Sequence, residues 1–177
     1  MNRDRPTRWL WTVALLVVTV AGCGYHLSGR GGPPPFLEGV QIIAVPPFEN
    51  RTKRPEIEQR VTEEVTRVLN SRGKYRVVPT AARADAVLEG AITSYRTQPV
   101  QFTATGRANR EEAVITVQAV LRNAADDQVL WSQSGLIFKE QYDVPESGEV
   151  FDREIVALDL LARGVADTLV TSIFEGF

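Results

Sequence analysis

Residues 113–121 alternate between an apolar series and a second, mixed series. The apolar series consists of Ala113, Ile115, Val117, Ala119 and Leu121. Because successive side chains of a strand point to opposite faces, this period of two predicts a strand with one largely apolar face. An apolar sheet face must be buried against a second layer, so another part of the chain has to cover it.

Two segments, 55–71 and about 150–174, have the spacing of amphipathic helices that could form this layer. Their apolar residues recur at helical intervals: Ile57, Val61, Val65, Val68 and Leu69 in the first, and Ile155, Leu158, Ala162, Val165, Leu169 and Ile173 in the second. Pro55 suits a first helical turn, and Gly73 follows the last turn of the first helix. We therefore expect two long helices, each with one apolar stripe.

Four further apolar runs are interpreted as strands. They are 40–45, 75–78, 85–92 with a continuation through Tyr95, and 129–131. The polar stretch 98–110 is expected to be a loop, whereas 124–127 supplies turn residues for an antiparallel hairpin between the last two strands. The helix between the first two strands favours a crossover that makes those strands parallel.

These elements together predict an α+β fold. Helices with one apolar stripe each are satisfied by a two-layer sandwich, with two long helices packed on one face of a mixed four- to five-stranded sheet. The other face of this sheet would then meet solvent or a partner.

The N-terminal segment has the features of a secretory signal. A basic stretch within residues 1–8 is followed by the apolar run 9–20, two small residues and Cys23, the only cysteine of the chain. The apolar run has about 12 residues, whereas a membrane-spanning helix needs roughly 20. A cysteine at this place resembles the bacterial lipobox, so we expect 1–22 to be a lipoprotein signal peptide and Cys23 to be the lipid attachment site. An ordinary signal peptide or a buried free cysteine is the alternative.

The segment 23–36 is rich in glycine and proline and is interpreted as a tether, which leaves 37–177 as a single domain.

Composition excludes several function classes. The net charge of −2 offers no general basic field for nucleic acid. The only histidine, His26, lies in the tether, so no metal site, cofactor site or nucleophilic triad is recognisable and we expect no enzyme. Carboxylates are plentiful, but no pair of them marks an acid–base site.

The order of these features resembles one family, the LptE family of lipopolysaccharide-assembly lipoproteins. The run Cys23-Gly24-Tyr25-His26-Leu27 is the most specific part of the resemblance, and the strand 42–45, the helix, the strand 85–92, the hairpin and the last helix follow in order. The resemblance implies an LptE-like domain over 37–177 and no catalysis. It also implies a protein, lipid-anchored at the periplasmic face of the outer membrane, that plugs an LptD-like β-barrel translocon. There it would assist barrel assembly and lipopolysaccharide transport. Gly24, where aspartate would favour inner-membrane retention, agrees with the outer membrane.

Lipopolysaccharide carries anionic phosphates, so basic side chains near the hairpin are candidate contacts. The candidates are Arg96, Arg107, Arg110 and Lys139. They could equally be scattered solvated charges. Asp143, Glu146 and Glu149, expected in a loop before the last helix, argue against direct binding of lipopolysaccharide.

A second functional reading starts from the stretch 43–52. A strand followed by Pro47-Phe48-Glu49-Asn50 is also similar to lipoproteins that activate peptidoglycan synthases or form curli-type secretion channels. A channel would need membrane-crossing strands of about 9–11 alternating residues, and the predicted strands fit a soluble sheet better. The run at Cys23 favours the translocon plug over the synthase activator.

Overall fold

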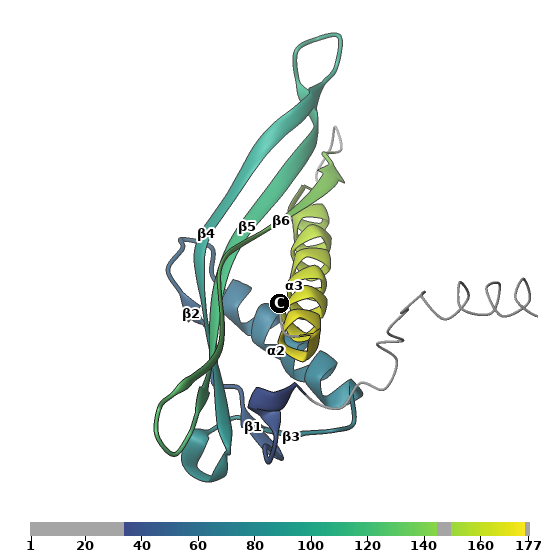
Figure 1. Ribbon diagram of the computed structural model, residues 1–177. Helices are drawn as coiled ribbons and strands as arrows, with labels where there is room; N and C mark the ends of the chain where they lie inside the picture. Colours follow the sequence, from purple (N-terminus) through teal and green to yellow (C-terminus); the bar gives the residue numbers. More distant parts are fainter. Residues whose placement is uncertain (1–33, 145–149, 176–177) are drawn as a thin grey trace, which may run out of the picture. The chain divides into compact units, whose positions relative to one another are not determined.

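The computed structural model describes residues 34–144 and 150–175, which belong to one compact unit, Pro33–Phe177. In chain order the elements are η1 (Pro35–Leu37), β1 (Ile42–Ala44), β2 (Glu49–Asn50), α2 (Ile57–Ser71), β3 (Arg76–Val78), η2 (Ala81–Arg83), β4 (Ala86–Phe102), β5 (Ala108–Asn123), β6 (Val129–Asp143) and α3 (Val150–Glu175) (Figure 1). Among these described helices, none has the length and apolar character needed to cross a membrane. The predictions for the signal peptide, Cys23 and most of the tether lie outside the described residues.

The strands form one mixed sheet of six strands in the order β3-β1-β4-β5-β6, with β2 pairing with β4 beyond the end of β1. β1 is parallel to both β3 and β4, and β2 is parallel to β4. The pairs β4–β5 and β5–β6 are antiparallel. The predicted crossover and the predicted hairpin are therefore both confirmed.

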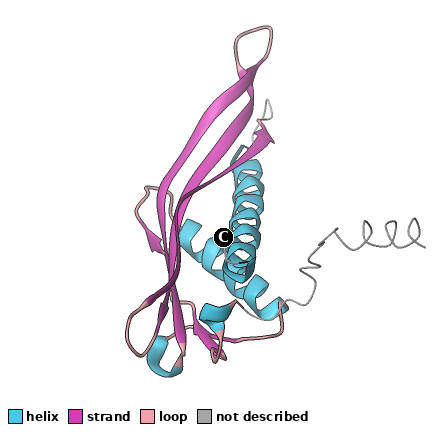
Figure 2. Cartoon of the chain, viewed as in Figure 1, coloured by secondary structure: helices cyan, strands magenta, loops and turns pink. Residues whose placement is uncertain are grey.

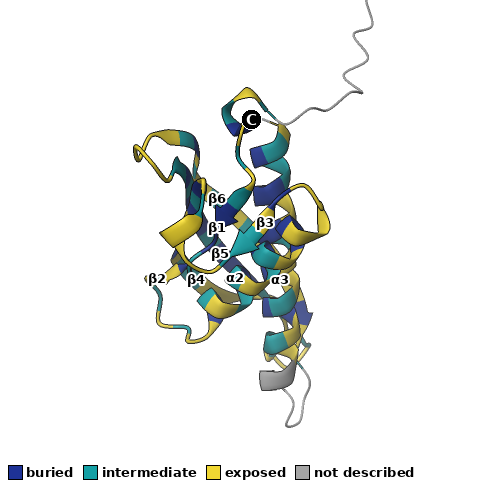
Figure 3. Ribbon diagram, turned by 90° about the horizontal axis from the view of Figure 1, so that it is seen from below, coloured by how far each residue is buried: buried dark blue, intermediate teal, exposed yellow. Residues whose placement is uncertain are grey.

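Both helices lie on the same face of the sheet, as Figures 1 and 2 show. The apolar series of β5 lies under them, and each of its members is at most 1% exposed. The buried core is formed by residues of both helices and of the strands beneath them, and Figure 3 marks the buried residues in dark blue along the ribbon. The two-layer α+β arrangement agrees with the prediction, whereas the expectation of two long helices is confirmed only in part, since α3 has 26 residues but α2 has 15.

The packing of Phe48 joins the two layers. The residue is 2% exposed and its ring lies directly on Gly90 of β4, so a Cβ at Gly90 would overlap the Cε2, Cδ2 and Cζ atoms of the ring. The Phe48 backbone N–H donates to Thr62 Oγ1 of α2 at 3.0 Å. Gly90 is therefore required by close approach of an aromatic ring in the middle of a strand.

The prediction of a loop over 98–110 was wrong. β4 continues to Phe102 and β5 begins at Ala108, which leaves only 103–107 as the turn. All residues of β4 from 98 onward are exposed, so no buried face imposes an alternation of apolar and polar residues there. Pairing with the neighbouring strand maintains the extended conformation instead.

Two other predictions of strand extent need correction. β6 continues to Asp143 rather than ending near residue 131, so Asp143 lies in a strand and not in the expected loop. The two-residue strand β2 was not expected, and it raises the number of strands to six. Glu146 and Glu149 lie outside the described residues.

Candidate functional site

The face of the sheet opposite the helices carries the basic side chains singled out in the sequence. Since the odd-numbered residues of β5 from 113 to 121 face the helices, its even-numbered residues face away from them. Val114 pairs with Arg96 of β4 on one side and with Lys139 of β6 on the other. Directly paired residues share a face, so Arg96 and Lys139 flank Val114 on the uncovered face. Val114 is 0% exposed there, as expected if long basic side chains lay their stems over it.

A carboxylate lies at the centre of the next row of the sheet. Glu112 pairs with Gln98 of β4 and with Gln141 of β6. The Gln98 side-chain amide donates to Glu112 Oε1 at 2.9 Å, and the Gln141 amide donates to Oε2 at 3.5 Å. Lys139 Nζ lies 3.9 Å from Glu112 Oε1, and the Glu112 side chain is only 12% exposed whereas that of Lys139 is 57% exposed.

The row beyond Glu112 contains a third basic residue. Arg110 pairs with Asp143 across the sheet, and its Nε lies 2.8 Å from Asp143 Oδ1. Arg96 is exposed and makes no ion pair with any residue that the structure describes. We use the name outer-face cluster for the seven residues Arg96, Gln98, Arg110, Glu112, Lys139, Gln141 and Asp143.

The structure thus brings three of the four candidate contacts together. Arg96, Arg110 and Lys139 share the uncovered face, while Arg107 lies in the turn at the end of the β4–β5 hairpin, where its backbone N–H donates to Thr103 Oγ1 at 3.2 Å. Sequence reasoning missed Glu112 and its two glutamine partners. The signal for Glu112 was its place one step before the alternating run 113–121, which puts it on the same face as Val114.

A second polar group lies on the helix face of the same strands. The Tyr95 hydroxyl donates to Glu154 Oε1 of α3 at 2.8 Å, and Arg54 Nε lies 3.6 Å from the same oxygen. The Tyr142 hydroxyl donates to Glu111 Oε2 at 2.6 Å. Burial, followed by these hydrogen bonds, raises the pKa of Tyr95 and of Tyr142 far above the usual value. Both tyrosines therefore stay protonated donors even at a pH where an ordinary tyrosine ionises, and the Tyr95–Glu154 bond attaches the first turns of α3 to the sheet.

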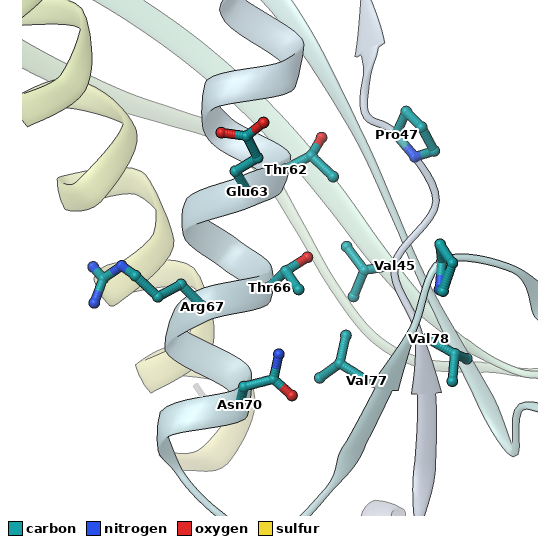
Figure 4. Close-up of a pocket in the computed structure, with 10 residues that line it drawn as sticks. Val45, Pro47, Thr62, Glu63, Thr66, Arg67, Asn70, Val77 and Val78 are labelled. Atoms are coloured by element: carbon teal, nitrogen blue, oxygen red, sulfur yellow. The ribbon is translucent and has the colours of Figure 1, made fainter.

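A groove of about 390 Å³ lies between α2 and the β1–β3 side of the sheet. Thr62, Thr66 and Asn70 point from α2 toward Val45 and Val77, as Figure 4 shows. Arg67 also lines the groove, and its guanidinium Nη2 lies 2.6 Å from Glu64 Oε2. Among the residues that the structure describes, no three histidine, cysteine or carboxylate side chains are grouped to hold a metal ion. The groove thus offers apolar contact and hydrogen-bonding groups.

Comparison with known proteins shows which family and which solved structures this chain resembles. A family model described as "LptE: Lipopolysaccharide-assembly" matches residues 40–173. The structure of lipoprotein B from Nitrosomonas europaea aligns with a TM-score of 0.57 and 14% identity, covering 86% of this chain and 92% of that chain. Rare lipoprotein B from Shewanella oneidensis aligns with a TM-score of 0.51 and 14% identity, covering 75% and 95%. A protein from Caulobacter crescentus aligns with a TM-score of 0.53 and 14% identity, covering 73% and 88%. At these identities the likeness concerns the fold alone, and no curated protein matches the chain significantly.

Proposed function

Because the chain belongs to the LptE family of lipopolysaccharide-assembly proteins, we propose that it docks into an LptD-like β-barrel of the outer membrane and plugs it. In this role it assists assembly of the barrel and transport of lipopolysaccharide, without catalysing a reaction. The single observation that carries the proposal is the family match over 40–173, which begins before β1 and ends within the last turn of α3.

Two long strand edges support an enclosing partner. Within the described sheet, β6 pairs only with β5, and the part of β4 beyond Ile92 also pairs only with β5. Exposed strand edges expose unpaired backbone groups to other chains, so natural proteins usually cover them. A barrel that surrounds the domain would shield both edges.

The location follows from the N-terminal segment as a further part of the proposal. Residues 1–22 act as the signal peptide, Cys23 carries the lipid, 23–36 form the tether, and 37–177 form the domain at the periplasmic face of the outer membrane. Two or three acyl chains would make this attachment effectively permanent.

The motif that suggested a synthase activator has a packing explanation. Phe48 is buried on Gly90, and Asn50 organises the turn before α2. The Asn50 side-chain amide donates to the Arg54 carbonyl and to Glu58 Oε2, both at 2.7 Å, while its oxygen accepts the Thr52 N–H at 2.9 Å. The residues of the motif therefore have structural roles in this fold.

Copurification tests the docking. The chain with a C-terminal tag is expressed in its native host, membranes are solubilised in mild detergent, and bound proteins are identified by mass spectrometry. We expect an LptD-like barrel. Recovery of a peptidoglycan synthase without a barrel would overturn the proposal in favour of the activator.

A Cys23→Ala chain serves as the control for anchoring, and it should lose incorporation of labelled palmitate and leave the membrane fraction.

The basic residues of the outer-face cluster, with Arg107 at the end of the hairpin, are the proposed lipopolysaccharide contacts. We expect the double substitution Arg96→Glu, Lys139→Glu to raise the Kd for lipopolysaccharide at least about tenfold, because each charge-assisted hydrogen bond contributes about 1.5–3 kcal/mol. Binding is measured by titrating purified protein in detergent with lipopolysaccharide at physiological ionic strength.

The matched control for this reversal is Arg76→Glu, Arg122→Glu. It changes the net charge equally at sites outside the cluster: Arg76 is exposed on β3, and Arg122 pairs with Glu89 at 3.6 Å near the opposite end of β5. The control should alter the Kd less than about twofold, since exposed charges a Debye length away are largely screened. Equal losses of affinity in both double variants would show that only the net charge matters. That result would contradict the assignment of the cluster as a binding site.

A further inference from the structure

We infer that the Glu112 carboxylate occupies the position in the outer-face cluster where a phosphate of the ligand would bind. By doing so it weakens the affinity of the cluster for that ligand. The inference rests on the proposed contact with lipopolysaccharide phosphates. It adds a residue that opposes binding to the residues that favour it.

The position of Glu112 in the sheet is the first argument. Its row lies between the row that contains Arg96 and Lys139 and the row that contains Arg110. Neighbouring strands are about 4.8 Å apart and same-face residues of one strand about 6.8 Å apart. Three cationic side chains thus lie in the rows on either side of Glu112, and one of them, Arg110, is already paired with Asp143 at 2.8 Å.

The contacts of the carboxylate are the second argument. Two amide donors and one ammonium group are directed at it, from Gln98 at 2.9 Å, Gln141 at 3.5 Å and Lys139 at 3.9 Å. This donor set of one cation and two N–H groups is what a phosphate oxygen would require. The Glu112 carboxylate therefore takes up the donors that these three side chains would otherwise offer to an anion from solution.

Unequal exposure is the third argument. The Glu112 side chain is 12% exposed, whereas those of Lys139 and Arg110 are 57% and 44% exposed. An incoming phosphate thus meets exposed Lys139 with the Glu112 carboxylate beneath it, whereas Arg110 is paired with Asp143, whose side chain is 69% exposed. It has to compete with Glu112 for Lys139, and it is repelled by the carboxylate at short range. A transport protein benefits from this arrangement because its ligand must leave as well as bind.

The test compares Glu112→Gln with the wild-type full chain, purified in detergent and titrated with lipopolysaccharide at physiological ionic strength. Glutamine keeps the size of the side chain and an acceptor oxygen but removes the charge. We expect the Kd to fall about tenfold, because one like charge within a few ångströms is removed. The melting temperature of each variant shows whether the fold is retained.

Glu89→Gln is the matched control. Glu89 lies on the same strand as Arg96, pairs with Arg122 at 3.6 Å, and is far from the cluster along the sheet. The control removes the same charge and should leave the Kd within about twofold, because solvent and salt screen it. A gain of equal size in Glu89→Gln would overturn the inference, since the effect would then be one of net charge.

The remaining outcomes separate this inference from the function on which it rests. If wild-type binding depends on Arg96 and Lys139 but Glu112→Gln does not tighten it, the inference fails and the proposed contact stands. If neither protein binds lipopolysaccharide, both fail. If Glu112→Gln tightens binding and the gain disappears when Arg96 and Lys139 are reversed in the same chain, the inference is supported.

Discussion

Val65→Asp should abolish the cooperative unfolding transition of the domain. Val65 is 0% exposed in the apolar stripe of α2, so the new carboxylate would be buried without a partner. Burying an unpaired charge is among the few single changes that cost about 4 kcal/mol or more, and whole domains are stable by only about 5–15 kcal/mol. Thermal unfolding of the purified protein, followed by far-ultraviolet circular dichroism, is the measurement.

Thr66→Asp is the control for this substitution. Thr66 follows Val65 on the same helix but lines the open groove beside Val77, where water can hydrate a carboxylate. Thr66→Asp should lower the free energy of unfolding by less than about 1 kcal/mol, the usual range for changes away from the core. A melting curve of Val65→Asp that matches that of Thr66→Asp would contradict the packing of α2 on the sheet.

Gly90→Ala is expected to destabilise the domain by about 1–3 kcal/mol, the usual cost of forcing an added group into a packed core. A single methyl group would overlap the buried ring of Phe48, which has to shift against its neighbours in the core. The free energy of unfolding from urea titration gives the cost directly.

Two comparisons identify the ring as the cause. In a Phe48→Leu background the same Gly90→Ala change should cost less, because leucine lacks two of the three ring atoms that the new methyl group meets, Cε2 and Cζ, and the double-mutant cycle measures this coupling. Gly164→Ala in α3 should instead stabilise the domain by up to about 1 kcal/mol, since alanine is the better helix former and its Cβ would lie at an ordinary 3.7 Å from Phe138 Cδ1. Additive costs in the cycle would exclude the Phe48 contact as the reason for a glycine at this position.

Elements with one buried face were predictable from sequence. All five residues of the predicted α2 stripe are buried, and α3 was expected over nearly the range that it occupies. The alternation in 113–121 identified the helix-facing residues of β5, each of them in the core or beside it. In these segments burial imposes the period of the element on the sequence.

Strand extent and register were not predictable in the same way. β4 beyond residue 98 is exposed, so its sequence carries no period. The pairing also shifts by one residue between Ile92 and Ser94 on β4, and again on β6 near Gly135, which has a φ of +71°. A bulge reverses which side chains face the core beyond it. The gathering of Arg96, Glu112 and Lys139 depends on these shifts, so the sequence could suggest the basic residues but not their common face.

The position of α3 in chain order has a consequence for biogenesis. α3 packs on β5 and β6 and covers their apolar face, yet it follows every strand of the sheet. In a polypeptide that emerges from a ribosome or a translocation pore N-terminus first, Ile115 and Val117 face water until residues 150–175 arrive. During that interval the nascent sheet is open to aggregation, and a holding chaperone would have its greatest effect there. Arrival of the C-terminal helix is therefore the event that completes the core.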